Sequence, residues 1–217
     1  MAKTPFYVVQ DFVSPKKCEE ILSKVEFASF DVDRDGNEMK MERHHDEVES
    51  FLFDRLKEHV PAIERTYDVK YRGTEKMRFQ QYPESKDSKP AEPHGCENSK
   101  FIKRKWVKYR DVDLVGVMWL KDFNDRVPLD PRHEVYGGRL EFPLYNFNFA
   151  PKRGTLVVYP AGPHFVTATS PILVGSLSQV KIGICVSDKE GLPWFYDGSA
   201  FAPKDGKYIE AWLSEHV

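Results

Sequence analysis

The spacing of apolar residues divides the chain into a helical first third and a strand-rich remainder. Residues Phe6 to Val9 are aromatic and β-branched, which predicts a short strand. Ser14-Pro15 supplies an N-cap and a proline suited to the first helical turn, and four apolar residues follow at helical spacing: Cys18, Ile21, Leu22 and Val25. Residues 31–37 are predicted to form a polar turn. A second helix is predicted from about Glu42 to Val60, with Pro61 at its end.

After this point the period of the pattern changes from helical to alternating. Residues 77–82 alternate like a half-buried strand, and the proline-rich residues 83–93 predict a loop. Further strands are predicted at residues 114–120, 139–142, 155–159 and 179–186. Short strands separated by glycine and proline favour a sandwich or barrel over βαβ units. We therefore predict a mainly β fold with N-terminal helices (α+β). It forms one domain over residues 1–217, with helical support (1–75), a β core (76–190) and a C-terminal extension (191–217).

Composition narrows the class of protein. The formal net charge is only −2 although 30% of the residues are charged, which argues against a nucleic-acid partner. A basic stretch with interleaved aromatic residues, 100–110, is therefore read as a solvated loop or edge strand. No apolar run approaches the ~20 residues needed to cross a bilayer, and no signal peptide is visible. Three cysteines without paired spacing indicate a reducing compartment. These features predict a cytoplasmic protein without a membrane partner.

Several short motifs follow one another in the second half of the chain. They are Tyr82 at the end of a strand, His94, Gly137-Gly138 ahead of Phe142-Pro143, Pro151 with Gly154 and Tyr159, His164, and Pro171 with Gly175. In order and rough spacing, over about residues 5–188, they resemble the prolyl 4-hydroxylase-like branch of the 2-oxoglutarate/Fe(II)-dependent oxygenases. The resemblance implies a double-stranded β-helix, the jelly-roll or cupin-like fold.

The resemblance also implies an activity. A member of this family hydroxylates a C–H bond and couples this step to oxidative decarboxylation of 2-oxoglutarate to succinate. The substrate would be a peptide, with peptidyl proline first, or a small molecule. The implied cofactors are Fe(II), 2-oxoglutarate as co-substrate, and ascorbate. His94 and His164 resemble the two histidine ligands, which with one carboxylate bind one face of Fe(II) and leave the opposite positions open.

The third metal ligand departs from the family pattern. The family has Asp or Glu two residues after the first histidine, where this chain has Cys96, and Glu97 comes one residue later. On a regular strand His94 and Cys96 share a face. A bulge at Gly95 would re-aim Glu97, which we therefore favour as the ligand. Two alternatives stay open: Cys96 as a thiolate ligand, and a site without a protein carboxylate, as in halogenating relatives.

The position of the cation that would bind the co-substrate also departs from the family pattern. The family has Lys or Arg two residues after the glycine equivalent to Gly175, where this chain has Leu177. Lys181 lies four residues further and shares the face of Leu177 on a continuous strand. We predict that Lys181 binds the far carboxylate of 2-oxoglutarate, with a hydrogen bond from Tyr82. An outward-facing Lys181 and a Tyr82 that only packs in the core are the alternatives.

Two further features of the sequence allow other interpretations. His44-His45-Asp46 contains a literal His-x-Asp, but it lies beside the predicted start of a helix, where Asp46 would favour the helix dipole. The double departure at Cys96 and Leu177 also admits a jelly-roll binding module that has lost its metal site, and a halogenase is a third reading. The sequence does not predict the oligomeric state or the substrate itself.

Overall fold

The computed structural model describes residues 5–25, 29–32, 38–42, 45–85, 97–103 and 105–191. The helix α1 (Pro15–Lys24) begins as predicted: the Ser14 side chain accepts a hydrogen bond from the backbone N–H of Lys17, at 3.3 Å. At the start of α2 (Asp46–Tyr67), the side chain of His45 caps the helix and accepts from the backbone N–H of Val48, and Asp46 lies in the first turn. The reading of His44-His45-Asp46 as a helix start is confirmed for His45 and Asp46, and residue 44 lies outside the described ranges.

The predicted bounds of the second helix were wrong at both ends. Residues Glu38–Glu42 form a strand, β3, which pairs with β2 (Ser29–Val32), so residues 31 and 32 also belong to a strand rather than a turn. At the other end the helix runs through Pro61, which faces solvent, where water can satisfy the carbonyl that the proline leaves without a donor. Ile63 and Tyr67 beyond it are buried, so their packing extends the helix.

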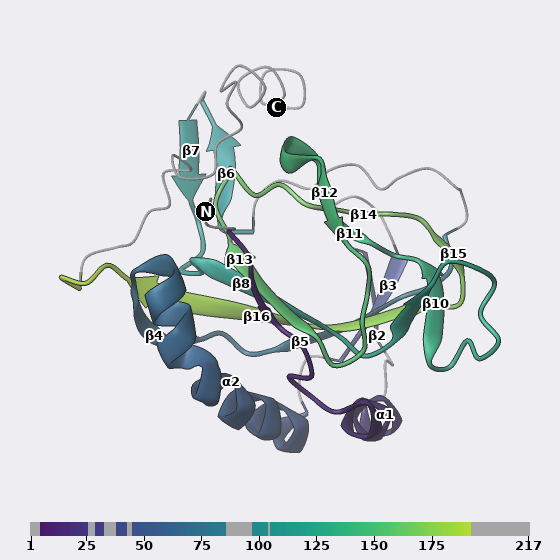
Figure 1. Cartoon of the computed structure of the whole chain (residues 1–217). Coiled ribbons are helices and arrows are strands. Elements are labelled where there is room, and N and C mark those ends of the chain that lie inside the picture. The colour runs from purple at the N-terminus through teal and green to yellow at the C-terminus, as the bar shows by residue number, and fades with distance from the viewer. Residues whose placement is uncertain are drawn as a thin grey trace.

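One large sheet and a set of smaller sheets form the two walls of the fold. The large sheet has the order β1-β13-β8-β16-β5-β3-β2, with β4 also paired to β16. Its remaining bounds are β1 Tyr7–Val9, β4 Lys70–Thr74, β5 Arg78–Tyr82, β8 Leu114–Trp119, β13 Leu156–Pro160 and β16 Leu177–Ser187. The helices cover one face of this sheet, and the smaller sheets lie across its other face (Figure 1). This arrangement is a jelly roll, as predicted.

The opposite wall consists of short strands. One three-stranded sheet has the order β15-β10-β9 and another the order β12-β11-β14. Their bounds are β9 Asp122–Asn124, β10 Glu134–Gly137, β11 Leu140–Phe142, β12 Phe147–Phe149, β14 Ala168–Thr169 and β15 Ile172–Val174, with a 3₁₀ turn at Pro143–Tyr145. A separate hairpin, β6 (Ser99–Ile102) and β7 (Lys105–Lys108), contains most of the basic stretch. Its exposed side chains agree with the prediction of a solvated edge.

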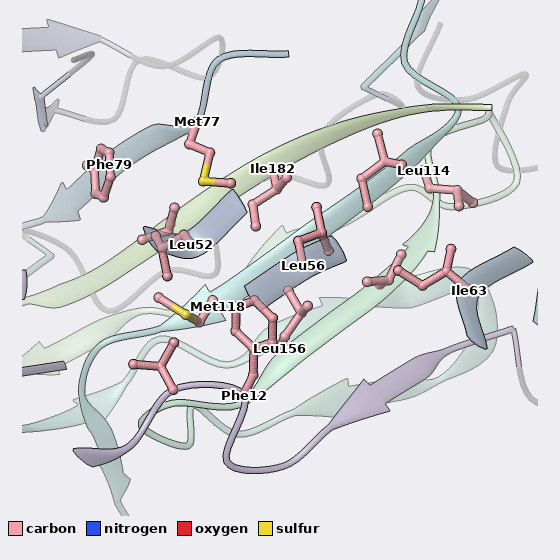
Figure 2. Close-up of a cluster of buried hydrophobic side chains, with 14 of the residues drawn as sticks. Phe12, Leu52, Leu56, Ile63, Met77, Phe79, Leu114, Met118, Leu156 and Ile182 are labelled. Atoms are coloured by element: carbon pink, nitrogen blue, oxygen red, sulfur yellow. The ribbon is translucent and has the colours of Figure 1, made fainter. Parts of the chain in front are cut away.

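Two hydrophobic cores lie on the two faces of the large sheet. Residues Leu52, Leu56 and Ile63 of α2 pack on Met118, Leu156 and Ile182, which makes the helix–sheet core (Figure 2). The interior core lies between the two walls and contains Val115, Val117, Trp119, Phe142, Tyr159, Phe165 and Leu177. Because successive residues of a strand face opposite ways, β8 and β16 contribute to both cores.

The glycines of the sequence motifs have a structural role. Gly137 and Gly154 have φ angles of +94° and +77°, a region that favours glycine. A Cβ atom at Gly137 would lie 1.9 Å from the carbonyl oxygen of Pro171, and one at Gly154 would lie 1.9 Å from that of Val13. Side chains at these positions would separate segments that the fold brings into contact.

Several predictions concern residues beyond these ranges. Residues 192–217, most of the predicted C-terminal extension, lie outside the described part of the chain. Cys96 lies outside the described part as well. Cys18 and Cys185 are described, and both are free thiols. Within the described ranges, no helix is long and apolar enough to span a bilayer.

Candidate active site

Lys181 lies on the interior face of β16. It pairs with Arg78 on β5 and with Val117 on β8. Its chain neighbours Val180 and Ile182 point the other way, into the helix–sheet core. The Lys181 side chain is only 14% exposed. It therefore points inward, on the same face as Leu177, as alternation along a continuous strand predicts.

A cluster of charged side chains surrounds Lys181. We call Lys181, Arg78 and Arg110 the interior cation cluster. Lys181 Nζ donates a hydrogen bond to Oε1 of Glu97, and Oε2 of Glu97 lies 3.5 Å from Arg78 Nη2 and 3.4 Å from Arg110 Nη1. Arg110 also forms an ion pair with Glu75. Among these five described side chains, three cations thus share two carboxylates, which leaves one net positive charge in the cluster.

The pKa values of Glu97 and Lys181 are shifted by burial and by the charges of the cluster. Burial alone would raise the pKa of Glu97, but the positive charges of Lys181, Arg78 and Arg110 outweigh burial and lower that pKa to about 2. Burial lowers the pKa of Lys181; Glu97 opposes this shift, and Arg78 adds to it. The pKa of Glu97 is thus lowered by its cationic neighbours, whereas that of Lys181 is lowered first by burial.

Asn98 fixes the position of Glu97. Its side-chain amide donates to the carbonyl oxygen of Val112 at 2.8 Å, and its backbone carbonyl accepts from the backbone N–H of Tyr109 at 2.8 Å. Its backbone N–H donates to the carbonyl of Ala161. These bonds hold the start of β6 against the barrel, so that Glu97 reaches the interior.

Gly183 makes room for the second carboxylate of the cluster. It lies two residues after Lys181 on β16, on the same face. A Cβ atom at Gly183 would lie 3.1 Å from Oε2 of Glu75 and 2.9 Å from a methyl group of Val112. A larger residue would therefore displace Glu75 from Arg110.

Polar and aromatic side chains complete the interior around the cluster. Gln179 lies next to Lys181 on the same face and donates a hydrogen bond to Gln80 at 3.1 Å. The Tyr159 hydroxyl is buried beside Thr167; burial raises its pKa, and the charge of Glu97 raises it further. A dry aromatic wall therefore lies next to the charged groups, where it strengthens their electrostatic interactions.

The structure places the other predicted site residues as follows. Tyr82 lies on β5 directly opposite Leu177, and both contact the interior core. His164 is half-buried in the turn after β13. His94 and Cys96 lie outside the described residues, so the predicted pairing of His94 with His164 stays a prediction. Among the described residues, no three or more His, Cys, Asp or Glu side chains form a group that could hold a metal.

Glu97, as the structure places it, does not fit a metal ligand. Its Oε1 accepts from Lys181, and its Oε2 faces Arg78 and Arg110. A divalent cation at this carboxylate would lie beside three positive charges, which is electrostatically unfavourable. The role of third ligand therefore requires the Glu97 side chain to leave the interior cation cluster.

Arg78 and Arg110 were not predicted as site residues from the sequence. Arg78 had a usable signal, because it opens the alternating strand of residues 77–82 and falls on the inward-facing positions with Gln80 and Tyr82. Arg110 had none, since it ends a basic stretch that its sequence alone predicts to be solvated. Only the tertiary structure turns it inward toward Glu75 and Glu97.

Comparisons with known proteins identify the fold. No family model matches the sequence, and no curated protein is significantly similar to it. Among solved structures, the viral collagen prolyl hydroxylase of Paramecium Bursaria Chlorella virus-1, in complex with 2-oxoglutarate, superposes with a TM-score of 0.61 at 12% identity. The match covers 85% of this chain and 97% of that one.

Two further structures have the same fold. A Trichoplax adhaerens prolyl hydroxylase, in complex with a peptide fragment of the hypoxia inducible factor, gives a TM-score of 0.56 at 13% identity, over 86% of this chain and 85% of that one. HygX from Streptomyces hygroscopicus, with nickel, 2-oxoglutarate and hygromycin B bound, gives 0.53 at 13% identity, over 89% and 86%. These matches confirm the jelly-roll prediction and the structural resemblance to prolyl 4-hydroxylases.

Proposed function

We propose that this protein is a 2-oxoglutarate-dependent oxygenase whose interior cation cluster binds the far carboxylate of 2-oxoglutarate. The observation that supports the proposal is the net positive charge buried inside the jelly roll. A buried cation needs an anionic partner, and among the described residues the ion pairs with Glu97 and Glu75 leave one charge of the cluster uncompensated. A dicarboxylate co-substrate supplies the missing negative charge.

Each residue of the site has a distinct role in this proposal. Lys181 forms a charge-assisted hydrogen bond with the far carboxylate, and Arg78, its partner across the strand pair, supports it. Tyr82 adds a hydrogen bond from the same strand as Arg78. The aromatic wall that includes Trp119 and Tyr159 excludes water, so that the co-substrate is held in one orientation.

Fe(II) would be held by His94 and His164, the ligands that the sequence resemblance implies. The iron supplies oxidative chemistry when it is bound, and the protein positions it. The proposed reaction is hydroxylation of a C–H bond coupled to decarboxylation of 2-oxoglutarate to succinate, with ascorbate as an auxiliary reductant. A peptide substrate is the first candidate, because two structural neighbours are prolyl hydroxylases and one of them holds a peptide. HygX with hygromycin B makes a small molecule the second candidate.

Calorimetric titration of 2-oxoglutarate tests the binding step, with Mn(II) present and oxygen excluded. We expect Lys181→Met to weaken binding at least about tenfold, since a charge-assisted bond is worth ~1.5–3 kcal/mol. Lys57→Met is the matched control, because Lys57 lies on the solvent side of α2. Succinate release with Fe(II) and candidate substrates then tests the reaction. Equal binding by both variants would remove Lys181 from the site.

A second candidate function is a carboxylate-binding module without a metal. Two observations favour it: three cations hold Glu97 away from any metal, and Leu177 occupies the expected cation position within an apolar core. Anaerobic titration with Fe(II) or Mn(II) separates the candidates. A binding module would take up 2-oxoglutarate equally with and without metal and would release no succinate.

A further inference from the structure

The carboxylate of Glu97 occupies the position that the proposed function assigns to the co-substrate. Its Oε1 accepts a hydrogen bond from Lys181, and its Oε2 faces two guanidinium groups. The far end of 2-oxoglutarate is also a carboxylate, so it requires the same donors. Both groups cannot bind Lys181 in this way at once.

We propose that Glu97 is an internal substitute for the co-substrate carboxylate, which neutralises Lys181 in the empty protein and must leave before a dicarboxylate can bind. This inference rests on the proposed function. It adds an autoinhibitory contact within the same site.

The charges explain why the empty protein needs such a contact. With Glu97 in place the cluster has three cations and two carboxylates; without it, Glu75, which pairs with Arg110, is the one carboxylate left among the described residues of the cluster. Two uncompensated positive charges in a site where Lys181 is 14% exposed would be costly. An internal carboxylate stabilises the site until an external one replaces it.

The local structure allows this exchange. Asn98 is held by five hydrogen bonds, so the backbone next to Glu97 stays in place. The glutamate side chain is unbranched, and a change of rotamer withdraws its carboxylate without moving Asn98. Withdrawal of Glu97 ends its contacts with Lys181, Arg78 and Arg110, but Arg110 remains paired with Glu75 in both states.

The contact has a measurable cost for the ligand. A ligand that binds only the state with Glu97 withdrawn has its apparent affinity reduced by the fraction of molecules in that state. Removing the Glu97 charge should therefore tighten binding of any dicarboxylate that uses Lys181. Glutarate is a suitable second ligand, because it has both carboxylates and lacks the keto group that would chelate a metal.

The test is calorimetric titration of 2-oxoglutarate and of glutarate into the full-length protein, with EDTA present. We expect Glu97→Gln to bind both ligands at least about tenfold more tightly than the unsubstituted protein. Glu58→Gln is the matched control. It removes one carboxylate charge from the exposed side of α2, where Glu58 pairs with Arg55, so we expect a change of less than about threefold.

The outcomes separate this inference from the proposed function. If Glu97→Gln binds as weakly as the unsubstituted protein with EDTA, while the unsubstituted protein binds 2-oxoglutarate with Mn(II), the inference is overturned and the function stands. If neither protein binds 2-oxoglutarate with or without Mn(II), both are overturned. Should Glu97→Gln fail to fold, Glu97→Asp provides the same test. Its carboxylate is one methylene shorter and would contact Lys181 less well, so tighter binding supports the inference and unchanged binding overturns it.

Discussion

The charges inside the jelly roll bind one another more tightly than they would at a surface. Glu97 is 19% exposed, and its pKa of about 2 lies below the ordinary value of 4.5 despite burial. A carboxyl group whose pKa is lower in the folded than in the unfolded state stabilises the fold above its unfolded pKa. This contribution is lost as the pH falls toward the folded pKa.

Acid should therefore destabilise the protein through Glu97. We expect the free energy of unfolding to fall between pH 5 and pH 2, with up to about 3 kcal/mol of the loss due to this residue. Urea denaturation at several pH values measures the loss. Glu97→Gln should be less stable at pH 7 and should lose less stability over this range. Parallel pH profiles for both proteins would contradict the prediction.

At the residue scale, the sequence predicted part of the site. The alternating pattern around Lys181 predicted its inward orientation, because a continuous strand fixes every second side chain. The partners of Lys181 were not predictable in the same way. Arg78 and Glu97 are 103 and 84 positions away in the chain, and only the pairing of β5 with β16 and the anchoring of Asn98 bring them together.

At the scale of elements, glycine-dependent turns hold the walls of the barrel in contact. The close approach of β10 to Pro171 depends on the absence of a side chain at Gly137, as the approach of residue 13 to β13 depends on Gly154. The sequence predicted the strands after these glycines, because apolar runs mark them. It did not predict β3, because three of its five residues, Glu38, Lys40 and Glu42, are charged.

Substitution of Gly137 should measure the strength of this contact. We expect Gly137→Ala to destabilise the fold by roughly 2–4 kcal/mol, because it adds a backbone clash at 1.9 Å to an unfavourable φ angle. Gly191→Ala is the matched control: its φ is +84° with nothing within 4 Å, so it should cost only ~1–2 kcal/mol. Chemical denaturation gives both values. Equal losses would mean that the clash is relieved elsewhere.

At the scale of the whole molecule, the two cores have different tasks. The helix–sheet core, with Leu52 and Leu56, stabilises the large sheet from outside the barrel (Figure 2). The interior core, with Trp119 and Phe142, forms the wall of the candidate site. The large sheet lies between the two cores, so the helices stabilise the sheet from the face opposite the candidate site.

Truncations in the two cores should separate stability from binding. Leu56→Ala should cost about 2–5 kcal/mol of unfolding free energy while leaving 2-oxoglutarate affinity within about twofold. Phe142→Ala should cost a similar amount and also weaken binding, because it opens the site to water. Denaturation and calorimetric titration measure the two effects. A Leu56→Ala variant with the same loss of affinity as Phe142→Ala would show that the cores are coupled.

The strand β16 has a consequence for how this protein could acquire new specificities. Its positions 180, 182 and 184 pack in the helix–sheet core, whereas positions 177, 179 and 181 face the interior of the barrel. Residues that determine the stability of the fold and residues that line the candidate site therefore alternate along one strand. A designer, or natural drift, can exchange one set while the other is kept.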